Sequence, residues 1–165
     1  MKQLYLVRHA KSSWENNKLK DIERPLNKRG ERDAPLMGRI MQENNIKPDL
    51  MITSPAERAL HTAKIFCREM DISKNNLIVE QKLYEAGRKD ILNVIHQFDN
   101  EKNYVMVFSH NPGLSELAGF LTSGNVYDIP TCGIVSITCK INNWNELEDF
   151  NCELDFFEYP KKHLK

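Results

Sequence analysis

The chain of 165 residues carries 23 Lys and Arg against 23 Asp and Glu, and 41% of its residues are hydrophobic. At about 150 residues per domain, this length predicts one domain over residues 1–165, with a flexible tail in the last few residues. The composition supports a buried core, which excludes disorder and collagen-like or coiled-coil repeats. Because the formal net charge is +0, we expect no nucleic-acid or membrane partner, and any anion site must be local.

The lengths of the apolar runs and the spacing of the cysteines bear on the location of the protein and on its cysteine chemistry. The longest runs, such as residues 104–108, are far shorter than the ~20 residues that span a bilayer. Residues 1–3 lead into a strand-like run and not into a signal peptide, so we expect a cytoplasmic protein. The cysteines lack CxxC or metal-ligand spacing, which favours buried reduced thiols over disulfides or zinc. They are Cys67, Cys132, Cys139 and Cys152.

Short apolar runs predict strands at residues 4–7, 50–52 and 105–108, each buried on both faces as in a parallel sheet. Between the first two, apolar residues recur at helical spacing. These residues are Ala34, Met37, Ile40 and Met41. Pro35 in this stretch either kinks the helix or marks its first turn.

The helix after residue 52 has the clearest boundary signals. Ser54 and Glu57 fit an S-x-x-E capping box, with Pro55 at the first helical position. One apolar stripe follows at helical spacing. It consists of Ala56, Ala59, Leu60, Ala63, Cys67 and Met70.

The second half of the chain changes its pattern. Helices are predicted at residues 88–98 and 112–121, and strands at 134–141 and 154–157 with no helix between them. The sequence therefore predicts an α/β fold with a mostly parallel central sheet and an antiparallel addition near the C-terminus.

Polar residues that can bind a ligand or take part in a reaction follow three of the predicted strands. Arg8 and His9 follow the first, Ser54 and the helix with Arg58 follow the second, and His110 follows the third. Ligands of open α/β sheets bind outside the carboxyl ends of the strands. Two histidines and two arginines are therefore expected at one edge of the sheet.

These residue types suit a phosphoryl group. The planar fork of arginine matches phosphoryl oxygens, and the N–H groups of a helix start at Ser54 add partial positive charge. A histidine can attack phosphorus through one ring nitrogen while the other donates to a carbonyl. Taken singly, a strand-end histidine or Arg58 is more often structural or solvated. Their coincidence at three strand ends favours the functional interpretation.

Three segments carry a resemblance to a known family. LYLVRHA (4–10), SPAERALHTA (54–63) and VFSHNP (107–112) resemble the signatures of the histidine phosphatase superfamily, whose hallmark is Arg-His-Gly. Ala10 replaces that glycine. The RPL run (24–26) with Gly30, the KSSW run (11–14) and the short chain are similar to its small SixA-like phosphohistidine phosphatases. The resemblance spans about residues 3–140 and implies a three-layer, phosphoglycerate mutase-like sandwich.

The resemblance also implies roles for individual residues. His9 would be the nucleophile, transiently phosphorylated, with Arg8, Arg58 and His110 binding phosphate and stabilising charge. Glu85, in Leu83-Tyr84-Glu85, matches the proton donor of the mutase-like branch, which small phosphohistidine phosphatases need not keep.

Other residues are weaker candidates. Asp21 and Glu23, in the loop after His9, are rivals of Glu85 as proton donor, although solvated loop carboxylates are the plainer interpretation. Phosphate contacts could also come from five residues that surface hydrogen bonding explains equally well, namely Lys11, Ser12, Ser13, Asn111 and Thr131. The remaining histidines are interpreted as bystanders, namely His61, His96 and His163.

The leading functional hypothesis is a metal-independent phosphatase without a cofactor, acting through a phosphohistidine intermediate. Its substrate would be phosphohistidine on a protein, because so short a chain leaves little sequence for a lid. The alternatives are a small-molecule phosphomonoesterase and a phosphate-binding module without turnover, against which retention of His9 and His110 argues. A metal site from His9, His110 and Glu85 is disfavoured by the neighbouring arginines. We expect a monomer.

Overall fold

The computed structural model describes residues 1–164. Its strands are β1 (Lys2–Arg8), β2 (Leu50–Thr53), β3 (Leu77–Val79), β4 (Tyr104–Ser109), β5 (Ile134–Cys139) and β6 (Cys152–Glu158). Its α-helices are α1 (Lys28–Glu43), α2 (Glu57–Glu69), α3 (Arg88–His96) and α4 (Gly113–Leu121).

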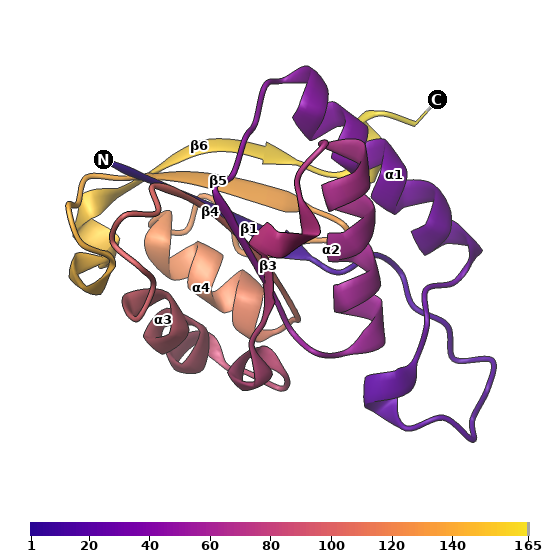
Figure 1. The fold of residues 1–165 in the computed structure, drawn as a ribbon. Coiled ribbons are helices and arrows are strands. Elements are labelled where there is room, and N and C mark those ends of the chain that lie inside the picture. Colours follow the sequence, from indigo (N-terminus) through magenta and orange to yellow (C-terminus); the bar gives the residue numbers. More distant parts are fainter. Residues whose placement is uncertain (165) are drawn as a thin grey trace.

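The strands form one six-stranded sheet in the order β3-β2-β4-β1-β5-β6. Strands β1 to β4 pair in parallel, whereas β5 is antiparallel to β1 and β6 is antiparallel to β5. Helices α1 and α2 cover one face of the sheet, and α3 and α4 cover the other (Figure 1). The predicted three-layer α/β class, with its antiparallel addition near the C-terminus, is confirmed.

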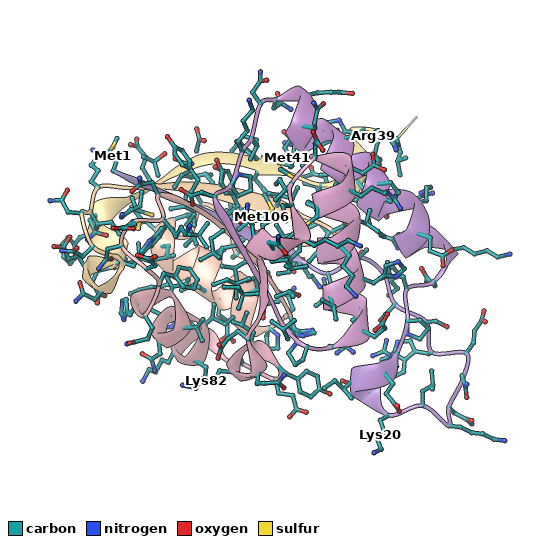
Figure 2. All side chains as sticks on the ribbon, viewed as in Figure 1. Met1, Lys20, Arg39, Met41, Lys82 and Met106 are labelled. Atoms are coloured by element: carbon teal, nitrogen blue, oxygen red, sulfur yellow. The ribbon has the colours of Figure 1, made fainter. Side chains whose placement is uncertain are left out.

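Alternation along β1 builds both core layers. Leu4 and Leu6 belong to the cluster packed with α3 and α4, whereas Tyr5 and Val7 belong to the cluster packed with α1 and α2. Successive side chains of a strand point to opposite faces, so a strand buried on both sides is apolar throughout. Figure 2 shows side chains filling the space between the sheet and the helices, with Met41 and Met106 labelled among them.

The predicted capping box at Ser54 is wrong. Helix α2 begins at Glu57 with Ala56 as its N-cap residue. Ser54 still pairs with the sheet, because its N–H donates to the Phe108 carbonyl at 3.0 Å. Its Oγ accepts from the N–H of Ala56 at 3.2 Å, and Pro55 lies before the helix. Leu60, expected in the buried stripe, is only half-buried.

Helix α1 starts earlier than its apolar spacing indicates. Asn27 is the N-cap, and its side chain accepts from the N–H of Gly30 at 2.9 Å. Pro35 therefore lies inside the 16-residue helix and does not mark its first turn. Apolar periodicity does not indicate this start, because the first turns of the helix consist mostly of polar residues.

Strand β3 escaped the sequence analysis. It is three residues long, and at the sheet edge it leaves Ile78 and Val79 exposed. Three residues are too few to show a hydrophobic periodicity, so the strand is recognised from its pairing with β2.

The C-terminal region differs from its expected boundaries. Strand β5 ends at Cys139, two residues before the predicted end, and β6 begins at Cys152, two residues before the predicted start. Where a flexible tail was expected, Pro160–Lys162 forms a 3-10 helix with Pro160 buried; Lys165 lies outside the described residues. All four cysteines are free, with Cys152 alone half-buried. Across residues 1–164, no helix is long and apolar enough to cross a membrane.

Gly30 allows the loop after β1 to pack against α1. A Cβ at this position would lie 2.2 Å from the backbone oxygen of Lys11. That same oxygen accepts from the N–H of Asn27 at 3.0 Å. Because the new Cβ would be fixed to the backbone of α1 and would meet a backbone oxygen, no side-chain rotation can relieve the clash.

We expect Gly30→Ala to lower the free energy of unfolding by about 1–3 kcal/mol, as overpacking does in dense interiors. Urea unfolding measures it. Gly87→Ala is the control, since its new Cβ would have a nearest neighbour at 3.7 Å and should cost less than about 1 kcal/mol. Equal losses in both variants would contradict the tight contact at Gly30.

Candidate functional site

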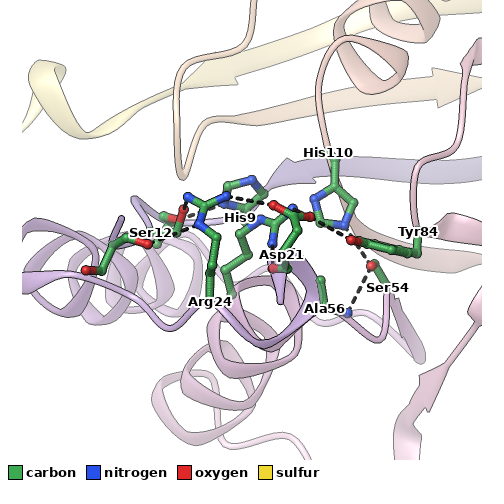
Figure 3. A network of polar contacts seen from close by, with 11 residues as sticks. His9, Ser12, Asp21, Arg24, Ser54, Ala56, Tyr84 and His110 are labelled. Carbon is green, nitrogen blue, oxygen red and sulfur yellow. Dashed lines mark hydrogen bonds and ion pairs between the residues drawn. The ribbon is translucent and has the colours of Figure 1, made fainter. Parts of the chain in front are cut away.

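The site lies at the carboxyl ends of β1 and β4 (Figure 3). Arg8 is the last residue of β1 and pairs in parallel register with Ser109, the last residue of β4. The next residues, His9 and His110, therefore lie side by side, with ring centroids 5.2 Å apart. The structure brings together the strand-end histidines that the sequence analysis singled out.

His9 is held as a neutral imidazole with one free ring nitrogen. Its Nδ1 lies 2.7 Å from the carbonyl oxygen of Ala10. Since a carbonyl can only accept, Nδ1 carries the hydrogen and Nε2 keeps its lone pair. The pKa of His9 is lowered to about 3, with burial as the largest cause. His110, Arg58 and Arg8 also lower it, whereas the hydrogen bond to Ala10 opposes them. Nε2 therefore keeps its lone pair near neutral pH.

Thr62 fixes the chain beside the His9 ring. Its Oγ1 accepts from the N–H of Ala10 at 3.0 Å and donates to the Arg58 carbonyl at 2.7 Å. One buried hydroxyl thus links the segment after β1 to the first turn of α2. Sequence analysis missed this residue, although it lies four positions after Arg58 in the SPAERALHTA run.

His110 presents a second ring nitrogen without a protein partner. Its Nε2 lies 2.7 Å from Ser54 Oγ, while its buried Nδ1 has no hydrogen-bond partner among the described residues. Its pKa is lowered to about 4, with burial as the largest cause; Arg58 and Arg8 also lower it, and Asp21 opposes them. If Ser54 donates to Nε2, Nδ1–H is left to donate to an anion. The sequence analysis assigned Ser54 to a helix cap and missed this contact.

Arg8 has a similarly unused donor. Its Nη1 donates to the Ile129 carbonyl at 3.0 Å, and its buried Nε has no partner among residues 1–164. Burying donors without partners is costly unless a ligand completes them. The unpartnered atoms of Arg8 and His110 therefore point to an anion between them.

Asn111 holds the segment that Arg8 contacts. Its Nδ2 donates to the same Ile129 carbonyl at 3.0 Å, and its Oδ1 accepts from the N–H and Oγ of Ser115. Both ends of the amide are thus engaged within the protein.

Arg58 is oriented by Asp21. Its Nη1 donates to the Asp21 carbonyl at 2.7 Å, and its Nη2 donates to the Asp21 carboxylate at 3.1 Å. That carboxylate also accepts from Tyr84 at 2.6 Å and from Arg24 at 3.0 Å. These partners, the Tyr84 hydroxyl first, hold the pKa of Asp21 well below its usual range. Asp21 is therefore an anion at neutral pH and a poor proton donor. Sequence analysis missed Tyr84 and Arg24.

Glu85 is next in the chain to a residue that contacts the site. It follows Tyr84, whose ring packs edge-on against His110 at a centroid distance of 5.8 Å. Glu85 is exposed, and its φ of 57° lies in the left-handed region. Non-glycine residues adopt this conformation at an energetic cost and often near functional sites. Glu23 is also exposed, and its carboxylate accepts from the N–H of Lys20.

The other candidates have contacts of their own. Ser12 Oγ accepts from Arg24, and Ser13 Oγ accepts from the N–H of Glu15. Lys11 is half-buried and Thr131 is buried.

The three remaining histidines lie on other segments. His61 is on α2, His96 contacts the Leu147 carbonyl at 3.0 Å and His163 pairs with Glu158. Within residues 1–164, no group of three or more His, Cys, Asp or Glu is arranged to hold a metal.

Neutral histidines and arginine forks, gathered at one edge of an α/β sheet, are groups that suit an oxyanion. The chain belongs to the histidine phosphatase superfamily (branch 1), whose model matches residues 4–91. Membership of this superfamily supports a phosphatase activity.

Relatives and solved structures resemble most of the chain. An uncharacterised chloroplastic protein of Arabidopsis thaliana is 29% identical over 88% of this chain and 70% of its own length. A structure described as phosphohistidine phosphatase SixA of Agrobacterium tumefaciens is 23% identical, with a TM-score of 0.81 over 96% of this chain and 98% of its own. Protein histidine phosphatase SixA complexed with tungstate is 21% identical, with a TM-score of 0.80 over 97% and 98% of the two chains. The fold is therefore that of the SixA structures.

The depressed pKa values of both histidines predict acid-sensitive stability. The unfolded chain takes up these protons near pH 6.5, whereas folded His9 does so only near 3 and folded His110 near 4. Below about pH 6.5 the unfolded state thus binds more protons, and stability falls with falling pH. We expect His9→Gln and His110→Gln each to remove about 1–2 kcal/mol of the loss between pH 7 and pH 5.

Urea unfolding at the two pH values measures this difference. His61→Gln, at a half-buried position on α2, is the control. A pH dependence identical in all four proteins would show that neither site histidine is held neutral.

Proposed function

We propose that this protein is a metal-independent phosphatase that removes a phosphoryl group from phosphohistidine on a protein. The observation that carries the proposal is the pairing of His9 Nε2, a free lone pair on a fixed imidazole, with the unpartnered donors of His110 and Arg8. A nucleophile and anion-binding donors share one buried edge of the sheet. A module that only bound phosphate would need the donors but not the oriented nucleophile.

In the first step, Nε2 of His9 attacks phosphorus, and the bond between phosphorus and the leaving group breaks. Arg8, Arg58 and His110 Nδ1–H bind the phosphoryl oxygens and stabilise the charge spread over them in the transition state. The Nδ1–H bond to Ala10 steadies the ring as it becomes positively charged on phosphorylation.

In the second step, water attacks the phosphoryl group on His9, and the N–P bond breaks. Phosphate leaves, carrying one proton of the water in its oxygens, and Nε2 recovers its lone pair. The other proton is released to solvent. The two displacements use the same donors, so no further binding site is needed.

The leaving group favours a phosphohistidine substrate. An imidazole leaves with a proton already on its other nitrogen, so it needs little help from a general acid. Asp21 is engaged as an anion by Arg58, Arg24 and Tyr84, and it cannot readily supply a proton. The site as built therefore suits a phosphoramidate better than an alkyl phosphoester.

A small-molecule phosphomonoesterase is the second candidate function, and Glu85 is the observation that favours it. It is exposed, adopts a left-handed backbone conformation and directly follows Tyr84, whose ring contacts His110. A carboxyl there could protonate an alkoxide leaving group, which a positioned acid accelerates by about 10² to 10⁴.

A labelling experiment tests the covalent step. Reaction with ³²P-labelled substrate and an alkaline quench should trap an alkali-stable, acid-labile phosphohistidine on wild-type protein. His9→Ala should abolish both label and turnover while keeping the fold, and His61→Ala should alter neither. Label on serine, aspartate or cysteine, or substantial turnover by folded His9→Ala, would refute the proposed nucleophile.

Leaving-group dependence separates the two candidate functions. If Glu85 donates a proton, Glu85→Gln should slow an alkyl phosphate by about 10² or more, slow p-nitrophenyl phosphate less, and spare phosphohistidine. Glu101→Gln is the matched control, because Glu101 is exposed and precedes β4 at its amino end, opposite the site. Equal losses of kcat/KM on all three substrates would remove Glu85 from the mechanism.

A further inference from the structure

Trp14, in the loop after His9, is an exposed aromatic side chain held in a fixed position. Its side chain is 73% exposed, whereas the other tryptophan, Trp144, is fully buried. The guanidinium of Arg24 stacks on the Trp14 ring, 3.2 Å from its centroid. One face of the indole is therefore covered by the chain, and a large apolar surface is left to solvent.

Arg24 is itself clamped, so it can hold the indole. It is 7% exposed, and each of its three nitrogens donates within the loop. Nε donates to the Ser13 carbonyl at 3.0 Å, Nη1 donates to Asp21 at 3.0 Å and Nη2 donates to Ser12 Oγ. Ser12 also bridges to Leu26 across the loop. The cation beneath Trp14 is thus buried and fully engaged, unlike an ordinary surface arginine.

The clamp places Trp14 next to the phosphoryl site without making it part of that site. Asp21 links the two, because its carboxylate accepts from Arg24 on one oxygen and from Arg58 on the other. Figure 3 shows Arg24 and Asp21 as neighbours in this network of contacts. Two side chains, Arg24 and Asp21, separate the indole from Arg58. We therefore expect a protein surface, and not a small phosphorylated molecule bound at Arg58, to reach Trp14.

We propose that Trp14 is a docking contact for the protein that carries the phosphohistidine. A fixed, exposed tryptophan loses little conformational entropy on binding, and such residues dominate protein interfaces. The proposal rests on the proposed function, because it names the side chain by which a protein substrate differs from a small one. It also gives a role to the tryptophan of the KSSW run, which the chemistry does not use.

A comparison of two substrates with the same phosphoramidate chemistry tests the docking role. The probes are free phosphohistidine and a tryptophan-free protein domain phosphorylated on a surface histidine with phosphoramidate. Trp14→Ala should raise KM for the phosphorylated domain about 5-fold or more, with kcat nearly unchanged. Its kinetics on free phosphohistidine should stay within about 2-fold of wild type, as expected for a side chain outside the pocket.

Phe150→Ala is the matched control. Phe150 is 84% exposed and lies just before β6. The first residue of β6 pairs with Cys139 of β5, and Cys139 in turn pairs with the amino end of β1. Phe150 is therefore at the end of the sheet opposite the site. It should change neither substrate. An unchanged KM for the domain in Trp14→Ala, or equal losses on both substrates, would overturn the docking role.

Iodide quenching provides a readout that does not need turnover or the Trp14 substitution. In His9→Ala protein, iodide should quench the exposed Trp14 and not the buried Trp144. Saturation with the phosphorylated domain should protect Trp14 from iodide, and saturation with free phosphohistidine should not. Full quenching in the presence of bound domain would overturn the docking role. Failure of wild-type protein to hydrolyse either substrate would refute the proposed function while this measurement still decides the docking role.

Discussion

The parallel pairing of β1 with β4 is the constraint on which the rest of the site depends. The register that places Arg8 opposite Ser109 also places His9 beside His110. Both strands are buried on both faces, so a slip of one residue would turn apolar side chains out of their layers. The same hydrophobic packing that stabilises the sheet therefore fixes the spacing of the two imidazoles.

Charge balance is the second organising principle of the site. Burial and the nearby Arg8 and Arg58 favour neutral His9 and His110. Asp21 pairs with the buried Arg58 and Arg24, and so offsets part of the cost of burying these two cations. A single loop carboxylate thereby joins the loop after β1, the start of α2 and the segment that carries Tyr84.

The loop between β1 and α1 packs against the helix, fixes Arg24 and exposes Trp14. Gly30 allows it to lie against α1, where a side chain would meet the Lys11 backbone. Arg24 then fastens its interior, and Trp14 is left on its outer surface. The loop borders the site and is held by side-chain hydrogen bonds together with a 3-10 helix at Asp21–Glu23 and a bridge between Ser12 and Leu26.

The sequence by itself determined the α/β class and the four side chains at the strand ends, because apolar runs and strand-end positions are local properties of the chain. It misplaced the start of α2 and missed β3, Thr62, Tyr84 and Arg24 as structural partners. Those features depend on contacts between segments distant in sequence, such as Ser54 with Phe108 and Asp21 with Tyr84. The tertiary structure alone decided that Asp21 orients Arg58, because the carboxylate joins Arg58, Arg24 and Tyr84 from three separate segments.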